Sequence, residues 1–208
     1  MEIELKYSID DDSLISKILD DRMLTSIEER NSRDTQALKA VYFDTEEGDL
    51  KKLDVAFRIR LEGSRYIATL KRRGSSCDGL HKREEINAPV TDDEFVTEPD
   101  LSIFSGDELI EDIRHIVEGK KLVPVMEMDY VREIFKVSYH NSIIEVSVDQ
   151  GDIWTSKGNV PICEMELELY SGNESELLKL GKAIQKAYNL KPENVSKLAR
   201  GFQVLDGE

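Results

Sequence analysis

Hydrophobic and polar residues alternate with a period of two over many short stretches of the chain. Such alternation is typical of β-strands with one apolar and one polar face. The clearest predicted strands are residues 2–7, 56–62, 66–71 and 80–86. Further strands are predicted over residues 39–44, 122–128, 130–138, 142–148 and 162–170, with a weaker one over 25–30. The short turns between neighbouring strands favour antiparallel pairing.

Helical spacing of apolar residues separates these groups of strands. Helices are predicted over residues 14–19, 107–117 and 175–188, with a short helical piece over 50–53. The segment 195–201 is expected to be helical or extended, 74–79 to be a loop, and 88–106 to be an irregular acidic insertion. The order of elements predicts a single α+β domain over residues 1–208, built as a closed or nearly closed antiparallel β-barrel with flanking helices.

The overall charge limits the classes of partner. The net charge of −15 argues against nonspecific binding to nucleic acid or to an anionic membrane, because both require a basic surface. A membrane span would need an apolar run of about 20 residues, which the sequence lacks, and the first residues do not resemble a secretion signal. We therefore expect a soluble, cytoplasmic protein, either a monomer or a homodimer, that binds a small ligand.

The polar faces of the predicted strands are unusually rich in charge. Glu2, Glu4 and Lys6 share one face, and Arg58 and Arg60 share another. An ordinary sheet with one wet face would explain any one of these strands. The run Glu164, Glu166 and Glu168 is harder to explain, because three carboxylates in one register repel each other unless cations neutralise them. Small barrels hold either apolar side chains or one ligand, so a charged interior predicts a charged ligand.

The mixture of charges narrows the chemistry of that ligand. Clustered carboxylates suit hard cations such as Mg²⁺ or Mn²⁺, whereas Arg and Lys side chains suit phosphate oxygens. Together they predict a metal-bridged polyphosphate site, where hydrolysis depends on positioning, charge neutralisation and an oriented water. The Gly-rich P-loop motif is absent from the sequence. The three histidines show no metal-ligand spacing and are expected at the surface.

The segment Glu2-Ile3-Glu4-Leu5-Lys6 resembles the E-x-E-x-K signature of the CYTH proteins, also called triphosphate tunnel metalloenzymes. Other segments resemble the family in the same order along the chain: Tyr42-Phe43-Asp44-Thr45, Phe57-Arg58-Ile59-Arg60, Thr69-Leu70-Lys71, Arg83-Glu84-Glu85, Arg132, Val148-Asp149-Gln150-Gly151, Glu164-Met165-Glu166-Leu167-Glu168 and Ser196-Lys197-Leu198-Ala199-Arg200-Gly201. The bacterial inorganic triphosphatase branch is the most similar. Its members often carry a CHAD domain after the tunnel, which this sequence does not contain.

The resemblance implies an eight-stranded antiparallel tunnel and a set of site residues. It implies metal binding by Glu2, Glu4, Glu164 and Glu166, with Asp149 near a second metal or the attacking water. It implies triphosphate binding by Lys6, Arg58, Arg60, Lys71, Arg132 and Lys197, with Glu2, Glu4, Lys6 and Asp149 as the catalytic set. Arg83 and Arg200 are further expected phosphate ligands, and Glu85, Glu145 and Glu168 lie in matching motifs with less defined roles.

Three functions remain open at this point. The first is metal-dependent hydrolysis of a triphosphate, with inorganic tripolyphosphate giving pyrophosphate and phosphate. The second is a different activity on an organic triphosphate, as in class IV adenylyl cyclases or thiamine triphosphatases. The third is a binding module for polyphosphate or nucleotides that has no catalytic activity. A cyclase needs a pocket that reads adenine, and no such motif is visible in the sequence.

Overall fold

The computed structural model describes residues 1–91, 93–104 and 110–207. Its strands are β1 (Glu2–Ser8), β2 (Asp34–Thr45), β3 (Ala56–Glu62), β4 (Arg65–Cys77), β5 (Leu80–Val90), β6 (Leu122–Tyr139), β7 (Ser142–Thr155), β8 (Gly158–Ser171) and β9 (Lys191–Pro192). Its helices are α1 (Ser13–Leu19), α2 (Arg22–Ser26), α3 (Asp49–Lys52), α4 (Asp93–Thr97), the 3₁₀ helix η1 (Leu101–Phe104), α5 (Glu111–Val117), α6 (Glu174–Tyr188) and α7 (Lys197–Asp206).

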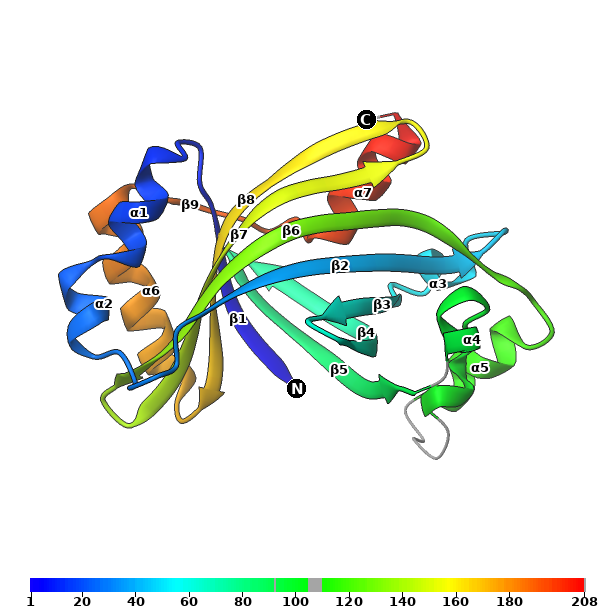
Figure 1. Ribbon diagram of the computed structural model, residues 1–208, viewed down its shortest axis with the longest axis horizontal. Coiled ribbons are helices and arrows are strands. Elements are labelled where there is room, and N and C mark those ends of the chain that lie inside the picture. Colours follow the sequence, from blue (N-terminus) through cyan, green and yellow to red (C-terminus); the bar gives the residue numbers. More distant parts are fainter. Residues whose placement is uncertain (92, 105–109, 208) are drawn as a thin grey trace.

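The strands form one antiparallel sheet that closes on itself. Hydrogen bonding follows the order β5-β4-β3-β2-β6-β7-β8-β1, and β1 also pairs with β5, which closes the barrel. Within the described ranges these are eight barrel strands, with β9 added beside the end of β1. Figure 1 shows the long strands β2, β6, β7 and β8 curving across the molecule, with helices at both ends. The predicted eight-stranded antiparallel barrel is confirmed.

The hydrophobic core lies between the barrel wall and its covering helices. Leu5 and Tyr7 of β1 are buried in one cluster with Leu180 and Ile184 of α6, at the end where α1 and α2 also pack. A second cluster lies beneath η1 and α5. Residues of α7 pack against a third. Because alternate residues point to opposite faces of a strand, this arrangement leaves the inward positions free for polar side chains.

Several predicted boundaries were wrong. Residues 122–138 form the single strand β6, because Asp129 pairs with both β2 and β7 and makes no turn. The strand expected over 25–30 does not form, because α2 continues to Ser26 and a turn follows it. The start of α2 is capped by the Asp21 carboxylate, which accepts from the amides of Met23 and Leu24. The only pairing in that region is an isolated bridge between Glu28 and Val137 among the residues described.

The Gly- and Ser-rich loop and the acidic insertion also differ from expectation. Strand β4 continues through the predicted loop to Cys77, after a bulge between Arg72 and Ser75. Strand β5 extends to Val90, and α4 and η1 follow it. Part of the helix expected over 107–117 falls on residues 107–109, outside the described residues, and α5 begins at Glu111. The final segment is the helix α7, capped by the Ser196 hydroxyl.

Candidate active site

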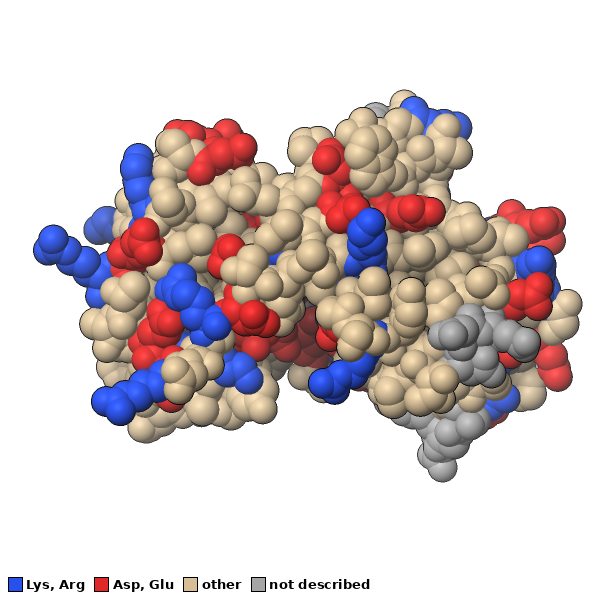
Figure 2. Space-filling model, viewed as in Figure 1, with Lys and Arg blue, Asp and Glu red and all other residues tan. Residues whose placement is uncertain are grey.

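The register of the sheet directs the predicted charged side chains into one tunnel. The cavity has a volume of about 150 Å³. Figure 2 shows acidic side chains in the recess in the middle of the face. Of the residues expected from the sequence, those that line the cavity are Glu2, Glu4, Lys6, Arg58, Arg60, Lys71, Arg83, Glu85, Arg132, Glu145, Glu166, Glu168 and Lys197. Asp149 and Glu164 lie behind this lining and form ion pairs with Lys197 of the lining, and Arg200 in turn forms an ion pair with Glu164.

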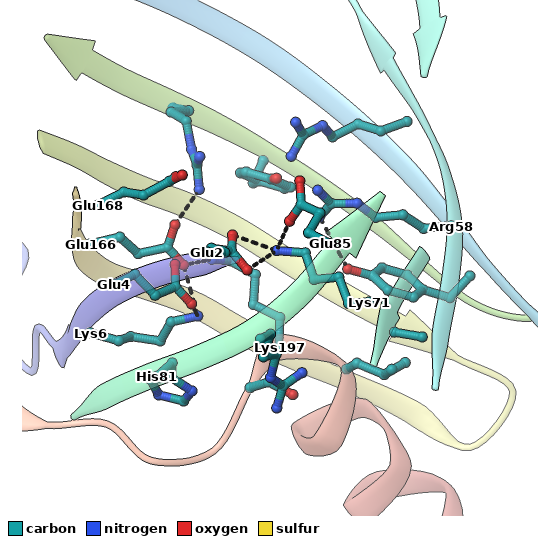
Figure 3. Close-up of a pocket in the computed structure, with 18 of the residues that line it drawn as sticks. Glu2, Glu4, Lys6, Arg58, Lys71, His81, Glu85, Glu166, Glu168 and Lys197 are labelled. Atoms are coloured by element: carbon teal, nitrogen blue, oxygen red, sulfur yellow. Dashed lines mark hydrogen bonds and ion pairs between the residues drawn. The ribbon is translucent and has the colours of Figure 1, made fainter. Parts of the chain in front are cut away.

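One row of carboxylates crosses three neighbouring strands of the tunnel wall. Glu4 of β1 pairs directly with Glu168 of β8, and Glu168 pairs with Glu145 of β7. Within the described part of the chain, Glu168 has no ion-pair partner within 4 Å. Burial and the charges of Glu2, Glu4 and Glu145 together raise the pKa of Glu168 to about 7. Burial likewise raises the pKa of Glu2. In the row formed by Glu2, Glu4, Glu145 and Glu168, the first three each have one lysine within 4 Å, and Glu168 is the member without an ion pair among the described residues. Glu2, Glu4 and Glu168 are labelled in Figure 3.

A second carboxylate cluster lies deeper and is already neutralised by the protein. Asp149, Glu164 and Glu166 offer oxygen atoms that lie within 4.8 Å of one another. The ammonium group of Lys197 lies 2.7 Å from Asp149 and 2.9 Å from Glu166, and it also contacts Glu164. Burial alone would lower the pKa of Lys197, but the three carboxylates raise it. Lys197 comes from the first turn of α7, so this helix supplies the counter-charge for residues of β7 and β8.

Arg132 and Lys6 complete the neutralisation of that deeper cluster. The Arg132 guanidinium donates to both Asp149 oxygens, at 2.6 and 2.7 Å, and to Glu166 at 2.5 Å. Lys6 lies 2.8 Å from Glu166 and 3.5 Å from both Glu4 and Glu164. Burial opposes ionisation of Asp149 and Glu166, yet the cations hold the pKa of both carboxyls below the ordinary value. Asp149 is fully buried beneath Arg132 and Lys197.

Two arginines of the tunnel, Arg58 on β3 and Arg83 on β5 beside Glu2 of β1, lack carboxylate partners among the described residues. The buried Nε atoms of Arg58 and Arg83 have no hydrogen-bond partner among the described residues. Neither guanidinium lies within 4 Å of a carboxylate in the same ranges. Arg58 donates only to the hydroxyl oxygen of Tyr42, at 3.3 Å. Burial would raise the pKa of Tyr42, but Arg58 lowers it. These two arginines are therefore positioned to receive an anion from the tunnel.

Lys71 of β4 lies between two carboxylates of the neighbouring strands β1 and β5. Its ammonium group lies 2.7 Å from a Glu2 oxygen and 2.7 Å from a Glu85 oxygen, as the dashed lines in Figure 3 indicate. Burial opposes ionisation of Glu85, but Lys71 and other donors lower its pKa to about 2. Two of the other predicted phosphate ligands are already paired, since Arg60 contacts Glu62 and Arg200 contacts Glu164.

Among the remaining residues of the tunnel lining are three ring-bearing side chains that the sequence did not identify as site residues. Tyr42 and Tyr130 line the cavity, as does His81. The surface position expected for His81 was wrong: it is buried, hydrogen-bonds the Glu193 carbonyl at 2.7 Å, and burial lowers its pKa. His115 and His140 are exposed as expected. The register signal that could have identified His81 is its direct pairing with Glu4 across β1 and β5.

Comparison with solved structures identifies the same fold elsewhere. A Hippeastrum protein, named as a candidate adenylyl cyclase that has a dominant triphosphatase activity, aligns with a TM-score of 0.71, 20% identity and coverage of 100% of this chain and 97% of that one. A candidate adenylate cyclase from Bacillus halodurans gives a TM-score of 0.61, 21% identity and 96% coverage of both chains. The mimivirus capping enzyme triphosphatase gives 0.53 at 10% identity, covering 90% of this chain and 89% of that one.

Sequence comparison gives a more direct relationship. The inorganic triphosphatase of Haemophilus influenzae is 31% identical to this chain over 162 residues, which is 77% of this chain. The chain spans 44% of the length of that curated relative. The structure describes no helix that is long and apolar enough to cross a membrane. The CYTH domain family matches residues 1–202, nearly the whole sequence. The chain therefore belongs to the CYTH domain family.

Proposed function

We propose that this protein hydrolyses a triphosphate in its tunnel, with inorganic tripolyphosphate as the substrate and pyrophosphate plus phosphate as the products. One observation carries the proposal. The tunnel has a carboxylate row in which Glu168 lacks an ion pair, and two arginines, Arg58 and Arg83, without carboxylate partners among the described residues. A ligand that brings both a divalent cation and a polyanion would compensate the carboxylates and the arginines at once.

The donor chemistry of the carboxylate row fits Mg²⁺ or Mn²⁺, because every side chain in it offers carboxylate oxygens. We propose Glu2, Glu4 and Glu168 as the principal metal-binding residues. The sequence pointed to Glu164 and Glu166, and these two lie in the tighter carboxylate cluster. Lys197 and Arg200 already occupy that cluster, whereas Glu168 lies directly opposite Glu4. A bound divalent cation would neutralise phosphate charge and help to orient the reacting oxygens.

We propose a positioning role for Asp149 in place of the expected role beside the attacking water. Both of its oxygens accept from Arg132, and one also contacts Lys197. A fully buried carboxylate held in this way fixes the directions of the two cations. Glu166 orients Lys6 and Arg132 in the same manner. This network would present Lys6, Arg132 and Lys197 to the triphosphate in fixed positions.

Arg58 of β3 and Arg83 of β5 would bind phosphate oxygens directly, because their guanidinium groups have no competing carboxylate among the described residues. Lys71, held between Glu2 and Glu85, would contact the chain of phosphates in the tunnel. Such contacts stabilise charge that develops on the transferring phosphoryl group and hold it in line with a water molecule. Hydrolysis in this arrangement needs no covalent nucleophile from the protein.

The activities named for similar proteins support hydrolysis. The Haemophilus influenzae relative is named as an inorganic triphosphatase, and the Hippeastrum protein is described by its dominant triphosphatase activity. The tunnel lining also contains only two aromatic residues among those described, Tyr42 and Tyr130, and both are buried in the third hydrophobic cluster. A cyclase would need a ring or paired donors exposed for adenine.

The test is a product assay with purified protein. Tripolyphosphate, ATP and thiamine triphosphate are each supplied with Mg²⁺ or Mn²⁺, and phosphate, pyrophosphate and cyclic AMP are measured. We expect tripolyphosphate to be cleaved fastest, slow phosphate release from ATP, and loss of turnover after exhaustive chelation. Formation of cyclic AMP from ATP faster than tripolyphosphate cleavage would replace hydrolysis with cyclisation. Full turnover in the presence of excess chelator would refute the metal requirement.

A further inference from the structure

The bulge in β4 lies directly opposite a tunnel arginine. Arg72 pairs with Glu84 and Ser75 pairs with Lys82. Between these pairs β4 contains residues 73 and 74, whereas β5 contains only Arg83. Two residues therefore oppose one, which is the arrangement that defines a β-bulge. Bulges occur next to active sites, where they change the direction of a side chain.

Gly74 of this bulge leaves the space that the Arg83 side chain occupies. A Cβ atom built on Gly74 would lie 2.7 Å from Arg83 Nε, 3.1 Å from its Cγ and 3.2 Å from its Cζ. The Arg83 side chain thus lies against the backbone of Gly74, closer than any other residue type would permit. Gly74 is not among the residues with positive φ, so alanine would fit the backbone there without strain. The three nearest atoms to such a Cβ all belong to the Arg83 side chain, so the conflict would fall on Arg83 first.

Among the described residues, Arg83 has no ion pair that would fix its direction in place of this contact. Its Nε atom is buried without a hydrogen-bond partner in the same ranges, and Arg83 lines the tunnel. The neighbouring cations differ in this respect, because Arg132, Lys71 and Lys197 are each held by two or more carboxylates. Packing against Gly74 is therefore the contact that orients Arg83.

We propose that Gly74 is a positioning residue for triphosphate binding, because the absence of its side chain directs the Arg83 guanidinium into the tunnel. The proposal rests on the proposed triphosphatase function. Alanine at position 74 would rotate Arg83 away from its present direction and weaken its contact with the substrate. The fold would change little, because a long flexible side chain can move where a backbone contact could not.

The first experiment separates this role from a structural one. Gly74→Ala, Arg83→Gln and the double variant are compared with Ser75→Ala, a matched control at an exposed position on the same strand. Melting temperature, the Kd for tripolyphosphate by calorimetry, and kcat and KM are measured. We expect each of the first two variants to lower kcat/KM about tenfold, mainly through KM, with melting temperatures close to the wild type. The double variant should lose no more than Arg83→Gln alone, because both changes remove one interaction. Ser75→Ala should behave as the wild type.

The second measurement needs no substrate. The ¹H–¹⁵N resonance of Arg83 Nε, assigned by its loss in Arg83→Gln, should shift in Gly74→Ala and stay unchanged in Ser75→Ala. Full kcat/KM in Gly74→Ala, an unchanged resonance, or additive losses in the double variant would each overturn the inference. A wild-type protein that neither binds nor cleaves tripolyphosphate would overturn the proposed function as well, whereas a wild type that does both isolates the failure to Gly74.

Discussion

Replacing Glu168 by Gln should stabilise the metal-free protein, and the effect should depend on pH. Glu168 lies in the row with Glu4 and Glu145 and has no cation within ion-pair distance among the described residues. Glutamine keeps the size and hydrogen-bonding capacity of the side chain but removes the charge. The variant therefore reports how much the folded state loses by ionising this carboxyl.

The magnitude follows from the pKa. Burial first, and then the charges of Glu2, Glu4 and Glu145, raise the pKa of Glu168 from 4.5 to about 7. A shift of this size corresponds to about 3 kcal/mol, which is an upper limit because solvent screens part of it, so about 1–3 kcal/mol is expected. Between pH 4.5 and 7 the folded state binds the proton and the unfolded state does not. Stability therefore falls as pH rises through this window, and the loss is complete above pH 7.

The assay is urea denaturation followed by circular dichroism, in chelator, at half-unit steps from pH 4 to 8. The difference in unfolding free energy between Glu168→Gln and the wild type should be close to zero at the acidic end and reach about 1–3 kcal/mol at pH 8. Glu85→Gln is the control with the opposite sign. Because Lys71 outweighs burial and lowers the pKa of Glu85 to about 2, that variant should be the less stable protein above pH 4.5. Parallel stability curves for Glu168→Gln and the wild type would refute the reasoning.

Three further predictions concern the cations of the tunnel and the cap of α3. Arg58→Ala should lower kcat/KM on tripolyphosphate at least tenfold, which corresponds to about 1.4 kcal/mol of transition-state stabilisation. The melting temperature should not fall, since Arg58 has no ion pair to lose among the described residues. An unchanged kcat/KM would mean that Arg58 does not contact the phosphates. Lys197→Met should lower the free energy of unfolding, measured by urea denaturation, by about 3–5 kcal/mol, because it leaves Asp149, Glu164 and Glu166 short of a buried counter-charge. Added Mn²⁺ should restore part of this loss. Equal stability of the variant and the wild type would contradict the prediction. Asp44→Ala should lower the free energy of unfolding, measured by scanning calorimetry, by about 1–3 kcal/mol, because the buried carboxylate accepts from the amides of Thr45, Leu50 and Lys51 at 2.7–3.0 Å. A loss within about 0.5 kcal/mol, as for ordinary surface substitutions, would show that water replaces these hydrogen bonds.

The alternation of residue types was sufficient to predict the barrel and the inward face of most strands. Period two fixes which side chains share a face, so Glu2, Glu4 and Lys6 were correctly grouped. It does not fix which residues face each other across strands, because register depends on turn geometry and bulges. The family resemblance implied Glu164 and Glu166 as metal ligands and left the role of Glu168 less defined, whereas the register places Glu168 directly across from Glu4.

Local composition misled the prediction where tertiary pairing was decisive. The segment Gly74-Ser75-Ser76 has the composition of a loop, yet β5 pairs with it and makes it strand after the bulge. His81 was expected at the surface because it lacks metal-type spacing, but its pairing with Glu4 makes it part of the tunnel. The division of cations into paired and unpaired groups also depends on distances between strands, which no sequence pattern contains.

The closure of the barrel by β1 has a consequence for synthesis on the ribosome. β1 is translated first, but it pairs with β5 and with β8, whose residues Glu164–Glu168 emerge about 160 positions later. Lys197, which neutralises the acids of β7 and β8, is translated later still. A nascent chain therefore holds an open-edged sheet with repelling carboxylates until its last helix is released. Ribosome-bound intermediates should be sensitive to proteases, and the tunnel should become competent for ligands only after α7 has left the exit channel.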